Sequence, residues 1–179
     1  MNPKRIVITG GPGTGKSSII NELSNRKYTC YEEVSRQVTK AARKDGIDQL
    51  FLTKPLLFSE LLLTARIKQF KKAEAESTPV IFYDRGLPDV LAYMEYLNTN
   101  YPKYFKEKCE SNKYDQIFIL PPWKAIYVGD KERYESFEQA CQIHNYLLKT
   151  YERFNYDLTE VPLGPIEQRT DFIINKFKS

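Results

Sequence analysis

The sequence predicts an α/β fold built on a parallel β-sheet, and three observations lead to this prediction. Short apolar runs rich in β-branched residues alternate with segments of helical periodicity along the whole chain. A glycine-rich stretch follows the first apolar run, where a strand would turn into a helix. The length of 179 residues, with 41% hydrophobic and 28% charged residues, suits one globular domain. Strands separated by helices favour right-handed crossovers and a sheet covered on both faces, which makes three layers.

Five apolar runs are the expected strands, and helices are expected between them. The strands are placed at residues 5–10, 28–34, 79–86, 115–122 and 158–162. The helices are placed at residues 16–25, 35–45, 55–76, 133–154 and 166–178, with a further helix starting just before Asp89. The segment 55–76 is apolar on more than one side, so part of it is expected to be buried all round.

Composition excludes several classes of protein. The net charge of +4 comes from basic residues mixed with acids, and without a basic stripe nucleic-acid binding is not expected. No apolar run approaches 18 residues, so no membrane span is expected. The N-terminus lacks the features of a secretory signal, and Cys30, Cys109 and Cys141 have no paired spacing. These features predict a cytoplasmic protein with reduced thiols.

The stretch GGPGTGKSS fits the phosphate-binding pattern G-x-x-x-x-G-K-[ST], known as the P-loop. A strand precedes it and a helix follows, so its backbone N–H groups can point at phosphate oxygens. We expect Lys16 to reach the β- and γ-phosphates and the Ser17 hydroxyl to bind Mg²⁺. The nucleotide is expected to be ATP, with GTP as a possible replacement. The residues expected to hold it are Gly10, Gly11, Pro12, Gly13, Thr14, Gly15, Lys16, Ser17 and Ser18.

Acidic residues follow the second expected strand in the stretch YEEVSR. Ligands of open parallel sheets bind beyond the carboxyl ends of the strands, so a carboxylate here would face the γ-phosphate from the acceptor side. Neighbouring Glu32 and Glu33 point to opposite sides, and we expect Glu33 to face the site and accept or orient a substrate hydroxyl. Arg36 is expected to pair with Glu33 or to hold an acceptor phosphate. The alternative is a surface ion pair near a helix start.

A second charged group ends the third expected strand, in FYDRGLPDVLAY. Asp84 terminates an apolar run, where a carboxylate is costly unless it serves a ligand. We expect it to hold Mg²⁺, directly or through water, or to act as a base. Arg85 is expected to stabilise phosphate charge or clamp the acceptor. Asp89 is expected either to contact the substrate or to interact with the N-terminus of its helix.

The polar segment after the fourth expected strand, residues 121–137, is predicted to be a lid over the nucleotide. It carries Lys124, Lys131 and Arg133, and Arg133 is the candidate to bring positive charge to the transferring phosphoryl group. Trp123 is either a hydrophobic anchor of this lid or a core contact. An ordinary exposed loop is the alternative for the segment.

Five stretches together resemble a known family. They are GGPGTGKSS, EEVSR, FYDRGLPDVLAY, PPW followed by GDKER, and VPLGPIEQR. They resemble the AAA-type ATPase/kinase-like P-loop domain shared by ribosylnicotinamide kinase domains of bacterial NAD-biosynthesis regulators and TRPL translocation defect proteins of insects. The resemblance spans nearly all of residues 1–179 and implies a P-loop NTPase sheet of order 2-3-1-4-5 with a lid after the fourth strand. It also implies that residues 161–167, Pro162 among them, pass near the nucleotide base.

Two functions stay open at this point. The first is a kinase that binds Mg·ATP and transfers the γ-phosphoryl group to an unidentified small molecule near Glu33, Asp84 and Arg85. The second is an ATP- or GTP-binding switch or adaptor that engages a lipid or a protein without phosphotransfer. The apolar segment 55–70 could line an acceptor pocket or a lipid cavity, which the sequence does not separate, and plain core packing is the alternative to both.

Overall fold

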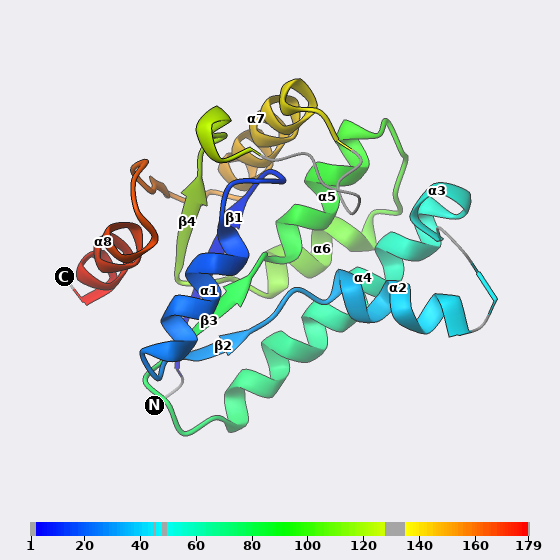
Figure 1. Cartoon of the computed structure of the whole chain (residues 1–179). Helices are drawn as coiled ribbons and strands as arrows, with labels where there is room; N and C mark the ends of the chain where they lie inside the picture. Colours follow the sequence, from blue (N-terminus) through cyan, green and yellow to red (C-terminus); the bar gives the residue numbers. More distant parts are fainter. Residues whose placement is uncertain (1–2, 45, 48–49, 128–134, 179) are drawn as a thin grey trace.

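The sheet of the protein is fully parallel. The computed structural model of the chain describes residues 3–44, 46–47, 50–127 and 135–178. The five strands are β1 (Lys4–Gly10), β2 (Thr29–Tyr31), β3 (Val80–Asp84), β4 (Gln116–Leu120) and β5 (Leu158–Glu160). Their order is β2-β3-β1-β4-β5, with β1 at the centre (Figure 1). The strand order implied by the resemblance is therefore confirmed.

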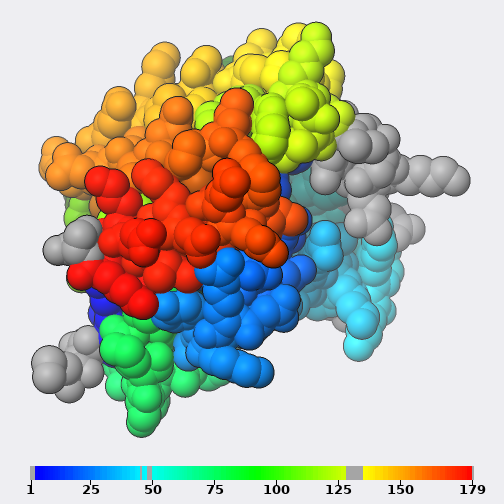
Figure 2. All heavy atoms as spheres, turned by 60° about the vertical axis from the view of Figure 1, so that its left-hand side comes forward, coloured from blue at the N-terminus to red at the C-terminus, as the bar shows by residue number. Residues whose placement is uncertain are grey.

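Helices cover both faces of this sheet, as expected for three layers. They are α1 (Lys16–Asn25), α2 (Ser35–Lys44), α3 (Leu50–Thr53), α4 (Pro55–Lys72), α5 (Leu87–Tyr96), α6 (Tyr104–Ser111), α7 (Phe137–Arg153) and α8 (Ile166–Lys178). Two 3-10 turns, η1 (Ala73–Ala75) and η2 (Lys124–Ile126), follow α4 and β4. α1 and α8 pack side by side on one face, which Figure 2 shows as blue against red. α4, α5, α6 and α7 pack on the other face.

Alternation along β1 creates two separate apolar cores. Ile6 and Ile8 are buried with residues of α1 and α8, whereas Val7 is buried with residues of α4, α5 and α7. Side chains on a strand point alternately to the two faces, so one short strand anchors both layers. Thr9 is the next residue on the same side of β1 as Val7. It is also fully buried, and its hydroxyl donates to Asp89 of α5.

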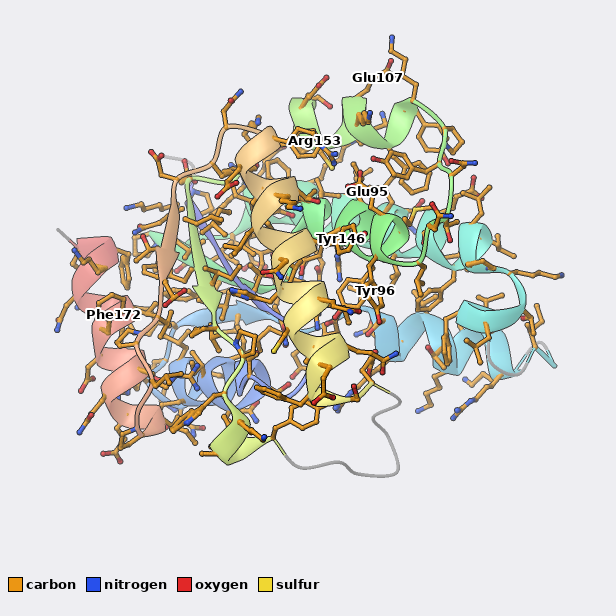
Figure 3. All side chains as sticks on the ribbon, turned by 90° about the horizontal axis from the view of Figure 1, so that it is seen from above. Glu95, Tyr96, Glu107, Tyr146, Arg153 and Phe172 are labelled. Carbon is orange, nitrogen blue, oxygen red and sulfur yellow. The ribbon has the colours of Figure 1, made fainter. Side chains whose placement is uncertain are left out.

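α5 and α7 are held together along their length. Arg153 Nη2 of α7 lies 2.8 Å from Glu95 Oε1 of α5, and the rings of Tyr96 and Tyr146 meet edge to face with centroids 5.9 Å apart (Figure 3). These contacts hold the C-terminal end of α5, and the hydrogen bond from Tyr151 Oη of α7 to Asp89 Oδ2 holds its first turn, which two residues separate from the end of β3. The position of α5 matters because its first turn carries part of the candidate site.

Several expected boundaries are wrong. β2 ends at Tyr31 and not at residue 34, and β5 ends at Glu160 and not at residue 162. α7 begins at Phe137, because Ser136 caps the helix by accepting the Gln139 N–H at 3.3 Å. Residues 133–134, where a start was predicted, lie outside the described part. Neither α3 nor α6 was predicted.

The segment expected to form one helix over residues 55–76 is α4 followed by η1. Part of this segment was expected to be buried on all sides. Near the start of α4 this is not observed, because the side chains of Leu56, Leu57 and Leu61 are 37–41% exposed. The opposite side of α4 is buried and includes Leu62, Leu63 and Arg66. Within the described residues, no helix is both long and apolar enough to cross a membrane.

Candidate active site

The P-loop connects β1 to α1 at the carboxyl edge of the sheet. Gly10 ends β1 with φ 149°, and a Cβ there would lie 2.6 Å from the Leu120 carbonyl oxygen of β4, so only glycine fits. Gly15 precedes α1 with φ 86°, a left-handed conformation that also favours glycine. Between them, the Thr14 hydroxyl donates to the Gly11 carbonyl at 2.9 Å and closes the loop.

Lys16 lies inside this loop. Its Nζ donates to the Gly11 carbonyl oxygen at 2.7 Å, and the side chain is buried. Burial, followed by the nearby Arg85 charge, lowers the pKa of Lys16 from 10.5 to about 7. An anion placed in the loop would stabilise the ammonium form, so the loop is built to gain from a bound phosphate.

Asp84 ends β3 next to the P-loop strand, with Ile8 as its partner in the β1–β3 register. The residue is buried, and its Oδ1 has no hydrogen-bond partner among the described residues. Burial raises the pKa of Asp84, and the Glu33 charge raises it further. A buried, unpartnered carboxylate oxygen beside Lys16 is the chemistry expected of a group that binds Mg²⁺ or its waters. Ser17 and Ser18 lie in the first turn of α1 and are exposed, so the Ser17 hydroxyl could serve as a further oxygen ligand.

A cluster of four charged residues lies next to the P-loop, and we call Glu33, Arg66, Arg85 and Asp89 the floor cluster. Glu33 Oε1 accepts from Arg66 Nη2 at 2.9 Å, and its Oε2 accepts from Arg85 Nε. Arg66 also donates to the Gly86 carbonyl oxygen at 2.7 Å. Burial pushes the pKa of Glu33 upward, but Arg85 and Arg66 together hold it below its ordinary value.

Arg85 connects this cluster to the P-loop. Its Nη1 lies 3.2 Å from the Gly10 carbonyl oxygen and 3.1 Å from Asp89 Oδ1. Its backbone is in the left-handed region with φ 74°, and its N–H donates to the Ile8 carbonyl at 3.0 Å. A non-glycine residue with positive φ is held there by its surroundings, and in Arg85 it turns the side chain back over the end of β1.

Asp89 is fully buried, and its two carboxylate oxygens are occupied. Oδ1 accepts from Thr9 Oγ1 at 2.7 Å, and Oδ2 accepts from Gly86 N at 2.9 Å and from Tyr151 Oη at 2.5 Å. Neither carboxylate oxygen of Asp89 is therefore free to contact a substrate, which was one of the two expectations for this residue. The contacts show the other expected role, which is capping. Asp89 accepts the backbone N–H of Gly86, the residue that precedes the first turn of α5.

Two further sequence-predicted residues, Arg36 and Pro162, are exposed and form no contact with this centre that the structure shows. Arg36 is exposed at the start of α2, while the partners of Glu33 are Arg66 and Arg85. Pro162 is exposed in the segment between β5 and α8. Arg133 lies outside the described residues, as does Lys131, so the predicted lid is seen only at its ends. At those ends, the Tyr127 hydroxyl donates to the Glu135 carbonyl, and the Tyr127 and Phe137 rings meet at 5.5 Å.

A cavity of about 410 Å³ opens above the floor cluster. Its walls come from α3, α4, α5 and the start of α7, and its aromatic lining consists of Phe51, Phe58, Tyr93 and Tyr96. All four members of the floor cluster line its charged end. Arg85 therefore both contacts the phosphate loop, through the Gly10 carbonyl, and lines the cavity.

Sequence reasoning missed two buried arginines. Arg66 lies in the middle of α4 and carries half of the contacts to Glu33, but no motif marks it. Its position among leucines in LLLTARIKQF was the available signal, because an arginine inside an apolar helical face needs a buried partner. Arg169 of α8 is also buried and donates to the Thr14 carbonyl of the P-loop at 3.0 Å. It ends the quoted stretch VPLGPIEQR, yet only earlier residues of that stretch were predicted to lie near the nucleotide.

Known structures share this fold at low sequence identity. Deoxyadenosine kinase from M. mycoides, solved with dCMP and dCDP, matches with a TM-score of 0.68 and 21% identity over 97% of this chain and 98% of that chain. Thymidylate kinase from Candida albicans matches with a TM-score of 0.70 and 17% identity over 99% and 92%. The NadR protein in complex with NAD and AMP-PNP matches with a TM-score of 0.73 and 17% identity over 98% of this chain, which spans about half of NadR (49%).

At such identities these likenesses establish the fold, which is that of P-loop nucleoside and nucleotide kinases. No curated protein sequence matches the chain significantly. The family model for an AAA domain matches residues 5–169, from the first strand to Arg169. That match covers nearly the whole chain, and the protein therefore belongs to this AAA domain family of P-loop proteins.

Proposed function

We propose that the protein is a phosphotransferase that uses Mg·ATP to phosphorylate a hydroxyl group of a small molecule. The observation that carries this proposal is the position of Arg85, which contacts the Gly10 carbonyl of the P-loop with one nitrogen and Glu33 of the cavity floor with another. A phosphate held by the loop and an acceptor held in the cavity would meet across this residue. Phosphoryl transfer needs two bound reactants in line, and a two-sided site provides that.

The donor side supplies the groups that this reaction needs. Backbone N–H groups of Gly13 to Lys16 and the Lys16 ammonium would bind the phosphates once Lys16 leaves the Gly11 carbonyl. Ser17 and Asp84 are the residues that would hold Mg²⁺, and the unpartnered Asp84 Oδ1 supports this assignment. Mg²⁺, when bound, would stabilise charge on the β- and γ-phosphates.

The acceptor side suits a molecule with a flat ring and no net negative charge. Arg66 and Arg85 are matched within the floor cluster by Glu33 and Asp89, so neither of these two arginines is left over for an acceptor phosphate. Glu33 is held ionised and would orient the acceptor hydroxyl or accept its proton. The aromatic walls favour a ring, and the nucleotides in the matched kinase structures make nucleosides the first acceptors to try.

A direct test is an acceptor screen with mass-spectrometric detection. The purified chain would be incubated with Mg·ATP or Mg·GTP and a panel of nucleosides, nucleoside monophosphates and other ring-bearing alcohols. We expect one class of neutral hydroxyl compound to gain a phosphoryl group, with ADP or GDP formed in equal amount. The Lys16→Met variant serves as the inactive control.

One result would contradict the proposal. If the wild-type chain binds nucleotide tightly, hydrolyses it slowly and phosphorylates no acceptor in the panel, the site is a nucleotide-dependent switch or adaptor. GTP preference together with retention on lipid vesicles would then support a lipid partner. Both readouts use the same protein preparation, so the two functions are separated in one series of measurements.

A further inference from the structure

Asp89 is a fully buried carboxylate that three separate parts of the chain hold in place. Thr9 Oγ1 of β1 donates to its Oδ1 at 2.7 Å, and the Gly86 backbone N–H donates to its Oδ2 at 2.9 Å. The third donor is the hydroxyl of Tyr151, which is itself fully buried and lies 2.5 Å from Oδ2. Tyr151 belongs to α7, so its hydroxyl adds a tertiary contact to a carboxylate that already caps α5.

The glycine at position 86 makes room for this hydroxyl. Its φ of −108° and ψ of 179° are extended values that any residue adopts, so the backbone conformation does not require glycine. A Cβ at this position would lie 2.6 Å from Tyr151 Oη, which is well inside the distance at which non-bonded atoms attract. Gly86 and Tyr151 are therefore a matched pair, in which the small residue lets the large one reach Asp89.

Asp89 in turn orients the guanidinium of Arg85. Arg85 Nε donates to Glu33, and Nη1 is shared between the Gly10 carbonyl oxygen at 3.2 Å and Asp89 Oδ1 at 3.1 Å. Nη2 forms no hydrogen bond within the described residues, and it is not shut off from solvent as the unpartnered Arg66 Nε is. A guanidinium is planar, so fixing Nε and Nη1 also fixes the direction of Nη2. Arg85 therefore keeps one accessible nitrogen in a fixed direction beside the P-loop.

The Tyr151 hydroxyl is suited to hold Asp89 permanently. Burial raises the pKa of Tyr151 well above its ordinary value, and the charge of Asp89 raises it further, so the hydroxyl keeps the proton that it donates. Removal of the hydroxyl would leave Asp89 Oδ2 with the Gly86 N–H alone. The carboxylate would then be free to turn toward its remaining donors, and this turn would move Oδ1, the atom that pairs with Arg85 Nη1.

We propose that Tyr151 is a positioning residue for the phosphoryl transfer and acts through Asp89 on Arg85. It fixes the Asp89 carboxylate, which fixes the Arg85 guanidinium and leaves Nη2 available to the transferring phosphoryl group. The inference rests on the proposed function, because it takes Arg85 to lie between a bound phosphate and an acceptor. It extends the site to α7, whose first turns also meet the P-loop, since a Cβ on Gly11 would lie 2.9 Å from the Ala140 carbonyl oxygen.

Two tyrosine-to-phenylalanine substitutions test this assignment. Tyr151→Phe removes the hydroxyl from Asp89, whereas Tyr156→Phe, the matched control, removes a hydroxyl that accepts the Tyr114 N–H at 3.1 Å. With the acceptor found in the screen, we expect kcat of Tyr151→Phe to fall about 10-fold and KM for ATP to change less than about 2-fold, because Arg85 acts on the group in transfer. Tyr156→Phe should keep the wild-type kcat. Thermal melting measures what each hydroxyl contributes to stability, and equal losses of kcat in both variants would overturn the assignment.

Gly86→Ala approaches the same contact from its other partner. The added methyl group would displace the Tyr151 hydroxyl, so we expect Gly86→Ala to lose about as much kcat as Tyr151→Phe. The double variant should lose no more than either single variant, because both substitutions remove one and the same contact. Losses that multiply in the double variant would contradict a role of Tyr151 through Asp89.

NMR of the Arg85 Nε–H resonance tests the positioning without turnover. The resonance is identified by its absence in Arg85→Lys, and its exchange with solvent reports how firmly the guanidinium is held. We expect several-fold faster exchange in Tyr151→Phe and wild-type exchange in Tyr156→Phe. Unchanged exchange in Tyr151→Phe would refute the inference. A wild-type chain that phosphorylates no acceptor would refute the proposed function, and this comparison would then still decide whether Tyr151 positions Arg85.

Discussion

The floor cluster and the donor side of the site both contain buried charged groups, but they differ in how their carboxylates are satisfied. In the floor cluster, both oxygens of Glu33 and both oxygens of Asp89 accept hydrogen bonds from the protein itself, and Arg66 Nε is a buried nitrogen without a partner among the described residues. On the donor side, Asp84 Oδ1 and two nitrogens of Arg169 have no partner in the described part of the chain, and Lys16 donates to the carbonyl of its own loop.

This difference indicates that the floor cluster is the preorganised half of the site. A satisfied cluster keeps its geometry without a ligand and stabilises the fold, because removing one partner exposes the others as buried, unpaired charges. Unsatisfied groups cost stability and recover that cost only when a ligand arrives. We therefore infer that substitutions in the floor cluster mainly lower stability, and substitutions on the donor side mainly affect function.

The largest functional effect is expected for Lys16→Met. The substitution keeps the buried stem of the side chain but removes the charge that would face the phosphates, so turnover should fall by about 10³-fold or more. Steady-state kinetics with the acceptor found in the screen measures kcat and KM, and thermal melting checks the fold. Lys68→Met, at an exposed position of α4, should keep full activity. Full activity in Lys16→Met would refute the assignment of the P-loop.

Glu33→Gln is expected to cause the largest loss of stability. It leaves the buried guanidinium groups of Arg66 and Arg85 without one of their carboxylate partners, which should lower the free energy of unfolding by about 3 kcal/mol. Urea denaturation of both proteins measures this difference.

The neighbouring Glu32→Gln provides the control for that measurement. Glu32 is exposed, and surface charges contribute little, so its effect should stay below about 0.5 kcal/mol. If both variants are equally stable, the floor cluster does not support the fold, and the contrast drawn between the two sides is wrong.

The sequence predicted the sheet and the phosphate loop because both depend on local patterns. Apolar runs ended by glycine, charge or proline marked β1, β3 and β4, and the spacing of glycines and Lys16 marked the loop. The resemblance added the strand order. Glu33, Asp84 and Arg85 were placed in one site because parallel strands bring their carboxyl ends to the same edge.

The parts that could not be predicted depend on tertiary contacts. Arg66 and Arg169 come from helices far along the chain, and only packing brings their side chains to Glu33 and to the P-loop. Substrate contact stayed open for Asp89 in the sequence because the hydroxyl that occupies its Oδ2 belongs to Tyr151, 62 positions away. The short helices α3 and α6 lack the long periodic pattern by which helices are recognised in a sequence.

The stability of the protein should depend on pH through Lys16, with a moderate effect. The pKa of Lys16 is lowered to about 7 in the fold from 10.5, so between these values the unfolded chain binds a proton that the folded chain lacks. Stability should therefore rise with pH in this window and be lost as the pH falls through about 7, with a slope of at most ~1.4 kcal/mol per pH unit. Urea denaturation at about pH 7, 8 and 9 should show this slope in the wild type and in Lys68→Met, but not in Lys16→Met. An identical slope in Lys16→Met would contradict a lowered pKa of Lys16 in the folded protein.

Among the substitutions of charged site residues, the smallest effect on stability is expected for Asp84→Asn, and this variant separates the two sides most directly. The pKa of Asp84 is raised by burial, so the carboxylate is under strain in the folded state, and a neutral amide of the same shape removes that cost. We expect the free energy of unfolding at neutral pH to stay within about 1 kcal/mol of the wild type, or to increase, while Mg²⁺-dependent turnover is lost. Asp89→Asn, the matched substitution in the floor cluster, should instead destabilise by about 2–3 kcal/mol because an amide cannot accept all the hydrogen bonds that Asp89 accepts. A destabilisation of Asp84→Asn as large as that of Asp89→Asn would show that Asp84 is a structural partner of Lys16, and the donor side would then be as preorganised as the floor cluster.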